Sequence, residues 1–347
     1  MVLPFRPVNA FRLSHATRRL SLAYAVGLVL WLAAFRYWGE RSPWLILPLF
    51  APLWLWGLPL LGLIPAAIAW HRRSLALLLP CLLFFLLGPY GWHWHGGAGR
   101  PEEEGASRIT VMTYNTGENN GTPLEPFFDR EKPDLLLLQD VRGRRYRFAD
   151  PFRKGYFHAA RGEFTILSRW PIRSATPIRL SGATTLAAVR FEIDHPAHPF
   201  AVYNIHFPTP RPDVIELFTG SQPVRQRLAR YQAAHAKRLA LYGLFVEQLA
   251  DDPLPHLLVG DFNAPSWGYL HSLFSRRFDD AFSRTGNGFG FTFPGWDPWL
   301  PTFFGPWLRL DFIFSAPPWH PVACKVEPQR ATQHQAVVAT LEWRPEP

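Results

Sequence analysis

One short segment of this chain, Gly260-Asp-Phe-Asn-Ala-Pro265, places polar side chains directly after an apolar run. The run, Leu257–Val259, has the composition of a buried strand, so Asp261 and Asn263 come where that strand should end. Taken alone, an Asp in this position is most often a turn residue or a helix cap. The same arrangement recurs along the chain, and the recurrence indicates a function.

Five further polar residues stand at the ends of other apolar runs of strand length: Asn115, Asp140, His206, Asp311 and His334. Strand ends that meet at one edge of a sheet bring their side chains into one crevice, so we expect these residues to lie together with Asp261 and Asn263. Carboxylate and amide oxygens suit Mg²⁺ or Mn²⁺. A His beside an Asp suits proton transfer or stabilisation of a phosphoryl oxygen.

Short strands dominate the later part of the chain. One long stretch, Val224–Ala250, instead has apolar residues at the spacing of an amphipathic helix that packs on a sheet. Many strands and few long helices predict an α/β fold with sheets packed face to face, in one domain of about 240 residues. The basic residues of the long helix form either a phosphate-binding stripe or, as we favour, a solvated outer face; they are Arg225, Arg227, Arg230, Lys237 and Arg238.

The charge of the chain is unevenly distributed. The formal net charge is +9 over 347 residues, but residues 1–100 hold nine Arg and one acid, Glu40, so the remainder is almost neutral. Net charge is therefore no argument that the later part binds a polyanion. The chain has only two cysteines, Cys81 and Cys324, which excludes a disulfide framework and a Cys-based zinc site.

Three apolar runs precede the strand-rich part. They predict transmembrane helices at about 20–38, 44–70 and 74–91, within a membrane region 1–95. A linker at 96–107 and a single domain at 108–347 follow. The first run also has the features of a cleaved signal peptide, an alternative that the two later runs disfavour.

The arginines predict the orientation of the membrane region. Arg6, Arg12, Arg18 and Arg19 precede the first run, and the 71–73 turn between the second and third runs is basic. The positive-inside rule puts both in the cytoplasm and the domain after three crossings on the far side. The Arg, Pro and Trp usage suggests a bacterial source, for which this is a multi-pass inner-membrane protein with an extracytoplasmic domain.

Seven segments of the later part, in order, resemble the endonuclease/exonuclease/phosphatase superfamily of deoxyribonuclease I-like metal-dependent phosphoesterases. They are Val111-Met-Thr-Tyr-Asn-Thr-Gly117, Asp134-Leu-Leu-Leu-Leu-Gln-Asp140, Ile166-Leu-Ser-Arg-Trp-Pro-Ile172, Tyr203-Asn-Ile-His206, Gly260-Asp-Phe-Asn-Ala-Pro265, Thr292-Phe-Pro294 and Arg309-Leu-Asp-Phe-Ile-Phe314. The resemblance implies a four-layer α/β/β/α sandwich and hydrolysis of a phosphodiester by in-line attack of water.

The resemblance also implies roles for single residues. Asp261 would orient or deprotonate the attacking water, and Asn263 would hold a phosphate oxygen or the metal. His206 would stabilise developing charge or assist the leaving group. His334 would face the scissile phosphate, with Asp311 fixing its tautomer. The logic agrees with the chemistry, since attack on phosphorus needs a cation, a carboxylate near the water and oriented imidazoles.

The metal site implied by the resemblance departs from the usual pattern. Asp140 would be the acidic ligand of Mg²⁺ or Mn²⁺, with the amide of Asn115 beside it, but the family usually has Glu where Asp140 stands. The family's final Ser-Asp-His is Thr332-Gln-His334 here, so the neutral Gln333 replaces a carboxylate and cation affinity should fall. The alternative is a catalytically degenerate, membrane-tethered binding or scaffold protein of the same fold.

The sequence leaves the substrate open between nucleic acid and a phospholipid head group, and it does not identify protein partners. Residues 289–307 hold eight aromatic side chains interleaved with Gly and Pro. This segment would pack onto the domain, rest on a lipid surface or stack against bases. Membrane tethering and the lack of net positive charge favour lipid slightly.

Overall fold

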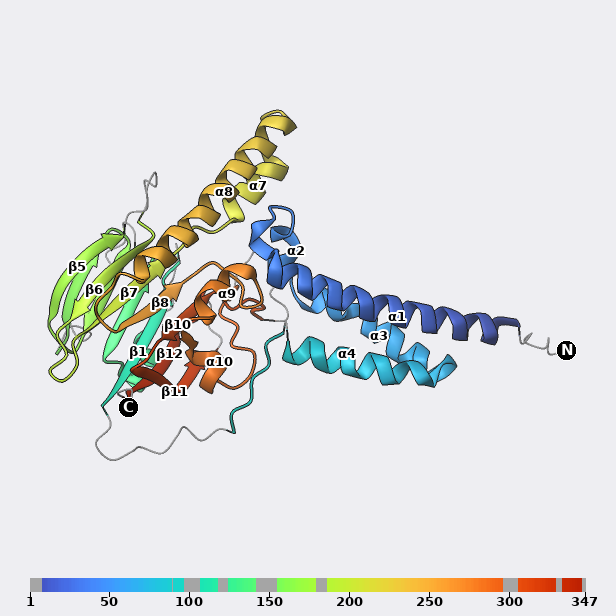
Figure 1. The fold of residues 1–347 in the computed structure, drawn as a ribbon, viewed down its shortest axis with the longest axis horizontal. Helices are drawn as coiled ribbons and strands as arrows, with labels where there is room; N and C mark the ends of the chain where they lie inside the picture. The colour runs from blue at the N-terminus through green and yellow to red at the C-terminus, as the bar shows by residue number, and fades with distance from the viewer. Residues whose placement is uncertain are drawn as a thin grey trace. The chain divides into compact units, whose positions relative to one another are not determined.

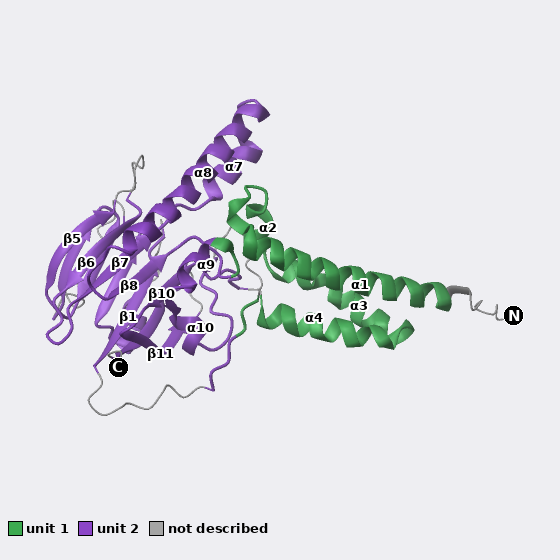
Figure 2. Cartoon of the chain, in the orientation of Figure 1, with its two compact units in different colours: residues 1–92, 267–269 green, residues 93–266, 270–347 purple. Residues whose placement is uncertain are grey.

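The computed structural model describes residues 8–88, 90–96, 107–117, 124–141, 155–178, 186–295, 305–328 and 333–344. The chain forms two compact units, residues 1–92 with 267–269 and residues 93–266 with 270–347 (Figure 2). The predicted linker, 96–107, falls outside the described residues except at its two ends.

The first unit is helical. Its elements are α1 (Val8–Tyr37), the 3-10 turn η1 (Gly39–Arg41), α2 (Ile46–Phe50), α3 (Trp54–Trp70), the 3-10 turn η2 (Arg72–Ser74) and α4 (Leu75–Leu87). Apolar side chains of α3 and α4, among them Leu60, Ala67 and Leu78, are buried against one another and against Tyr24 of α1.

The prediction of three transmembrane helices is wrong, because only one described helix, Ala10–Tyr37, is long and apolar enough to cross a membrane. The predicted second span is divided: Ala51, which precedes Pro52, is extended, as a residue before proline tends to be, so α2 ends there and α3 has 17 residues. The predicted third span contains α4, whose 13 residues extend about 20 Å, less than the roughly 30 Å of a bilayer core.

The second unit contains two six-stranded mixed sheets (Figure 1). The first has the order β11 (Trp319–Val326), β12 (Val337–Trp343), β1 (Arg108–Asn115), β2 (Leu135–Gln139), β4 (Phe164–Ser168), β3 (Phe157–Arg161). The second has the order β5 (Ile172–Ile178), β6 (Ala188–Ile193), β7 (Phe200–His206), β8 (His256–Asp261), β10 (Asp311–Ser315), β9 (Asp279–Asp280). The helices are α5 (Glu125–Glu131), α7 (Arg211–Thr219), α8 (Val224–Leu249), α9 (Tyr269–Ser275) and α10 (Ala281–Thr285).

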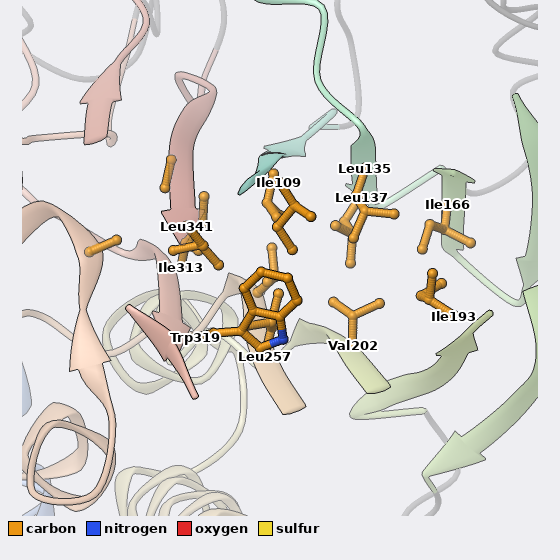
Figure 3. Packing of buried hydrophobic residues seen from close by; sticks show 14 of the residues in the cluster. Ile109, Leu135, Leu137, Ile166, Ile193, Val202, Leu257, Ile313, Trp319 and Leu341 are labelled. Atoms are coloured by element: carbon orange, nitrogen blue, oxygen red, sulfur yellow. The ribbon is translucent and has the colours of Figure 1, made fainter. Parts of the chain in front are cut away.

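The two sheets enclose one apolar core, which Figure 3 shows. Leu135 and Leu137 of β2 point into it, together with Val202 of β7 and Leu257 of β8. The alternate residues of β2, such as Leu136, belong to a second cluster with α5. Because both faces of β2 are buried, its sequence is a continuous run of leucines instead of an alternating pattern. The predicted α/β sandwich with sheets packed together is confirmed.

The sheet topology brings the polar strand ends to one edge. β1 and β2 are parallel, as are β7 and β8, so Asn115 is level with Gln139, and His206 with Asp261. β10 runs antiparallel to β8, so its first residue, Asp311, is opposite Asp261. Polar side chains at the ends of the parallel strands and at the start of the antiparallel strand β10 therefore lie close together.

Candidate active site

Asp261 occupies the centre of the candidate site, at the end of β8, with 1% of its surface exposed. It can lie there because the preceding residue is Gly260, whose φ is +139°. A Cβ on Gly260 would come within 2.1 Å of the Ile205 carbonyl oxygen on the neighbouring strand. Close approach of β7 and β8 thus requires glycine at this position.

Backbone and side-chain amides hold the Asp261 carboxylate. Its Oδ1 accepts a hydrogen bond of 2.8 Å from the backbone N–H of Asn263, and its Oδ2 accepts one of 2.8 Å from Nδ2 of Asn115. Nδ2 of Asn263 is 3.1 Å from the same Oδ2 and also donates to the Phe207 carbonyl. Asn263 has a left-handed backbone (φ 46°), which Asn tolerates better than most residues. These contacts fix the carboxylate's orientation.

The imidazole of His334 lies between two carboxylates, those of Asp261 and Asp311. Its Nδ1 lies 2.9 Å from Oδ2 of Asp311, and its Nε2 lies 3.8 Å from Oδ2 of Asp261. The Phe293 ring packs against the imidazole, with centroids 4.8 Å apart. An Asp at Nδ1 directs the Nε2 edge of the ring toward the site.

The imidazole of His206 also lies between two carboxylates, those of Asp261 and Glu163. Its Nδ1 lies 2.9 Å from Oε1 of Glu163, and its Nε2 lies 3.8 Å from the same Oδ2 of Asp261. Glu163 is buried in the turn between β3 and β4. The sequence pattern does not single out Glu163, because a carboxylate in a tight hairpin is ordinarily exposed to solvent.

The pKa values of His206, His334 and Asp261 all lie above their ordinary values. Burial alone would lower the pKa of His206, but the Glu163 hydrogen bond and the Asp261 charge raise it above its ordinary value. Burial likewise opposes the charged form of His334, and Asp311 and Asp261 raise its pKa. Burial, followed by the Asp311 charge, raises the pKa of Asp261. The histidines thus favour the imidazolium, while Asp261 becomes a better base.

The site offers ligands for a divalent cation. One ligand atom from each of Asp261, Asp311 and His334 lies within 4.8 Å of the others, and all three residues are buried. Oδ1 of Asp311 is buried and accepts no hydrogen bond within the described part of the chain. An unsatisfied buried carboxylate oxygen is costly unless it meets a cation or a proton, so the donor set fits a hard cation.

The two residues predicted to bind the metal lie beside this cluster. Nδ2 of Asn115 donates a hydrogen bond to Asp261, and Oδ1 of Asn115 accepts one of 2.9 Å from the Gly117 N–H. Asp140 is half-buried, has a left-handed backbone (φ 56°), and contributes to the raised pKa of His206. Their assignment as ligands stays a prediction. Gln333 is half-buried next to His334, and its carbonyl accepts from the Gly295 N–H at 2.6 Å. Thr332 lies outside the described residues.

Two polar residues of the resembling segments connect the sheets instead of entering the site. Nε2 of Gln139 on β2 donates to Oδ1 of Asn204 on β7 at 2.7 Å. Nδ2 of Asn204 donates to the carbonyls of Leu138 and Thr165, each at 3.1 Å. Both side chains are fully buried. Their hydrogen bonds are therefore structural, and they join the first sheet to the second beneath the site.

The aromatic segment 289–307 is described only in part, because residues 296–304 lie outside the described ranges. Phe289 and Phe291 are half-buried and stack on each other with centroids 5.2 Å apart. Phe293 contacts His334. The described aromatic residues thus pack within the domain, and one of them touches the site.

Chemically, the arrangement presents two imidazole Nε2 atoms to one carboxylate oxygen, each ring having a second carboxylate behind it. Imidazolium groups can bind a phosphate oxygen or protonate a leaving group, and a carboxylate of raised pKa can take a proton from water. Such a site suits hydrolysis of an anionic ester.

Sequence comparison identifies the family. The model of the endonuclease/exonuclease/phosphatase family matches residues 112–334. No curated protein sequence matches the chain.

Solved structures of similar fold share little sequence with this chain. An endonuclease/exonuclease/phosphatase family protein from Bacteroides thetaiotaomicron is 17% identical, with a TM-score of 0.48 over 69% of this chain and 99% of that one. Truncated TDP2 from Caenorhabditis elegans is 19% identical, with a TM-score of 0.48 over 68% and 98%. The 3′ phosphatase NExo from Neisseria, bound to a product DNA hairpin, is 15% identical, with a TM-score of 0.45 over 68% and 100%.

Proposed function

Because the chain belongs to the endonuclease/exonuclease/phosphatase family, whose members are typically hydrolases of phosphoester bonds, we propose that it hydrolyses a phosphodiester with water at the site around Asp261. The observation that carries the proposal is the convergence of His206 and His334 on one oxygen of Asp261, each ring held by a carboxylate of its own.

Each residue of the site has a part in this reaction. Asp261 orients the attacking water and accepts its proton, for which its raised pKa is suited. His334, held by Asp311, donates to a phosphate oxygen as negative charge develops. His206, held by Glu163, donates to the leaving oxygen or to a second phosphate oxygen. Asn263 fixes the carboxylate that performs the first step.

A divalent cation, Mg²⁺ or Mn²⁺, would neutralise charge on the phosphate oxygens when bound. Asp140, with Asn115 beside it, would hold the cation as the family resemblance implies, whereas the clustered carboxylates of Asp261 and Asp311 form an alternative set of ligands, because an imidazolium at His334 has no free lone pair for a cation. The two positions are separable by titration with Mg²⁺. If Asp140→Asn raises the metal requirement and Asp311→Asn mainly lowers the maximal rate, Asp140 is the ligand.

Turnover of a substrate panel tests the proposed function. The panel contains single- and double-stranded DNA, RNA, phospholipids and a generic phosphodiester, each with Mg²⁺ and with Mn²⁺. Asp261→Asn and His334→Ala should each lower turnover by at least about 10²-fold, the scale of general acid–base groups. Glu192→Gln, on β6, where the carboxylate pairs with Arg173 and Arg190, should retain the parental rate. Equal rates in all three variants would contradict the site assignment.

The choice between nucleic acid and lipid substrates has its own measurement. Binding of DNA by a nuclease weakens steeply with salt because phosphate contacts release counterions, whereas binding of a lipid or small phosphoester depends little on salt.

We place the catalytic unit outside the cytoplasm, attached to the membrane by α1. If no substrate in the panel turns over with either metal, the chain is better described as a membrane-tethered binding or scaffold protein with a degenerate site.

A further inference from the structure

Residues 211–230, which comprise α7 and the start of α8, form a helical arm that the proposed reaction does not use. No residue of α7 is buried. In Figure 1, α7 lies beside the N-terminal half of α8, and both extend beyond the strands of their unit. The arm is therefore a surface element without a core of its own.

Specific contacts order the arm. Nη1 of Arg227 donates to the Leu217 carbonyl at 2.5 Å, and Nη1 of Arg230 lies 2.9 Å from Oε1 of Glu216. Farther along α8, Arg238 is buried. Arg227 and Arg230, for which the sequence leaves a solvated face or a phosphate-binding stripe open, thus hold α7 against α8.

The arm exposes apolar side chains within residues 215–225, which we call its tip. Ile215 and Phe218, one helical turn apart on α7, are 54% and 63% exposed, and Val224, at the start of α8, is 65% exposed. Arg225 beside them is also exposed. Over the whole arm, four arginines stand against two acids, Asp213 and Glu216. An exposed apolar tip with a positive surround needs a binding partner of matching chemistry.

We propose that the tip of the arm rests in the interface of a bilayer that contains anionic lipids. Three apolar side chains are too few for a stable protein interface, which takes about 800 Å² and 20–30 residues from each partner. A bilayer interface, in contrast, is bound by a few apolar side chains together with positive charge.

A helix elsewhere in the chain also favours a bilayer as the occupant. The same chain carries α1, whose segment Ala10–Tyr37 is long and apolar enough to cross a membrane. Such an anchor keeps a lipid surface at high effective concentration, so even a weak contact at the arm would be populated. The inference concerns a surface apart from the site of Asp261, and it does not depend on the proposed hydrolysis.

The test uses the full chain, reconstituted in lipid nanodiscs, with an environment-sensitive fluorophore on a single cysteine. Cys81→Ser removes one native thiol, and the other, Cys324, is buried, which raises its pKa and keeps it unreactive. The label is placed by Phe218→Cys. Phe157→Cys is the matched control, because Phe157 is an equally large side chain, 50% exposed, on β3 of the same unit. The lipid is phosphatidylcholine, with or without phosphatidylglycerol, and carries a spin-labelled quencher.

With phosphatidylglycerol present, the label at 218 should emit at shorter wavelength and lose at least about half of its fluorescence to the quencher, while the label at 157 stays solvated. Adding Arg225→Glu should reduce that quenching in anionic discs and change it little in neutral ones. The proposal is overturned if positions 218 and 157 respond alike. It is also overturned if the label at 218 self-quenches between copies regardless of lipid, because the occupant would then be a second copy of the chain.

Discussion

At the scale of single residues, the site depends on carboxylates placed behind imidazoles. Asp311 and His334 are both visible in the sequence as polar residues next to strands, and their 2.9 Å contact needs only that the start of β10, in the second sheet, faces the residues before β12, in the first. Glu163 could not be found this way. Its contact with His206 spans 43 residues and two sheets, and the burial that makes Glu163 functional exists only after β3 and β4 fold over the site.

Removing the Glu163 carboxylate should change the pH profile of hydrolysis. The imidazolium of His206 is populated below its pKa, and Glu163 helps to raise that pKa, so activity extends to higher pH than an unpaired histidine allows. Glu163→Gln removes the negative charge, the pKa of His206 falls, and the alkaline limb of kcat/KM should move to lower pH. Above the parental limb the variant should lose about tenfold in rate.

The measurement is kcat/KM against pH for the parent, Glu163→Gln and Glu192→Gln. A rate loss that is the same at every pH would indicate a merely structural role for Glu163. If Glu192→Gln shifts the limb equally, the effect comes from net charge and not from the contact with His206.

Gln333 should limit the affinity of the site for its cation. It is half-buried next to His334, where the family carries a carboxylate. Gln333→Asp adds a negative charge near the proposed cation, so the Mg²⁺ concentration for half-maximal rate should fall by about tenfold. Gln222→Asp, the same change on the exposed arm, is the control. Unchanged Mg²⁺ dependence in Gln333→Asp would place this side chain outside the metal's surroundings. If only Gln333→Asp is active, the natural chain has a degenerate site.

At the scale of elements, apolar runs bounded by Gly, Pro, Asp and Asn predict most strands of both sheets, because burial on both faces gives a strong signal. The short edge strand β9 gives none, since Asp279 and Asp280 have no strand character. The second predicted span is divided at Pro52, and a count of apolar residues does not reveal this break. Composition therefore finds an apolar segment more reliably than it finds the ends of its helices.

The hydrogen-bonded pair Gln139 and Asn204 should contribute strongly to stability, because it joins the two sheets in a buried place. Asn204→Ala leaves Nε2 of Gln139 and the carbonyls of Leu138 and Thr165 without this partner. The free energy of unfolding should fall by about 2–4 kcal/mol, the cost of buried groups without hydrogen bonds. Urea unfolding followed by tryptophan fluorescence measures it. Gln222→Ala removes an exposed amide and should change the midpoint little; an equal midpoint for the two variants would contradict a structural role for the bridge.

At the scale of the whole molecule, the chain combines a helical unit with a two-sheet unit that carries all the proposed catalytic side chains. The sequence predicts a division near residue 100, where the composition changes sharply. The number of membrane crossings is predicted poorly, because it depends on helix length and not on apolar content alone.

The arginines around α1 predict the side of the membrane on which the catalytic unit lies. Arg12, Arg18 and Arg19 precede its apolar part, whereas Arg36 and Arg41 follow it together with Glu40. The greater positive charge before the apolar part predicts that the N-terminus stays in the cytoplasm, so a single crossing by α1 places the catalytic unit outside it.

In intact cells, a reporter that is active only in the cytoplasm should be silent when fused after Pro347, and one that is active only outside should work. Arg12→Gln combined with Arg18→Gln and Arg19→Gln leaves Arg6 on one side against Arg36, Arg41 and Glu40 on the other, which removes the charge difference and should produce a mixed orientation, with both reporters partly active. A cytoplasmic reporter that works at full level on the parental chain would contradict the assigned side, and a second one fused before residue 8 would then show whether α1 crosses at all.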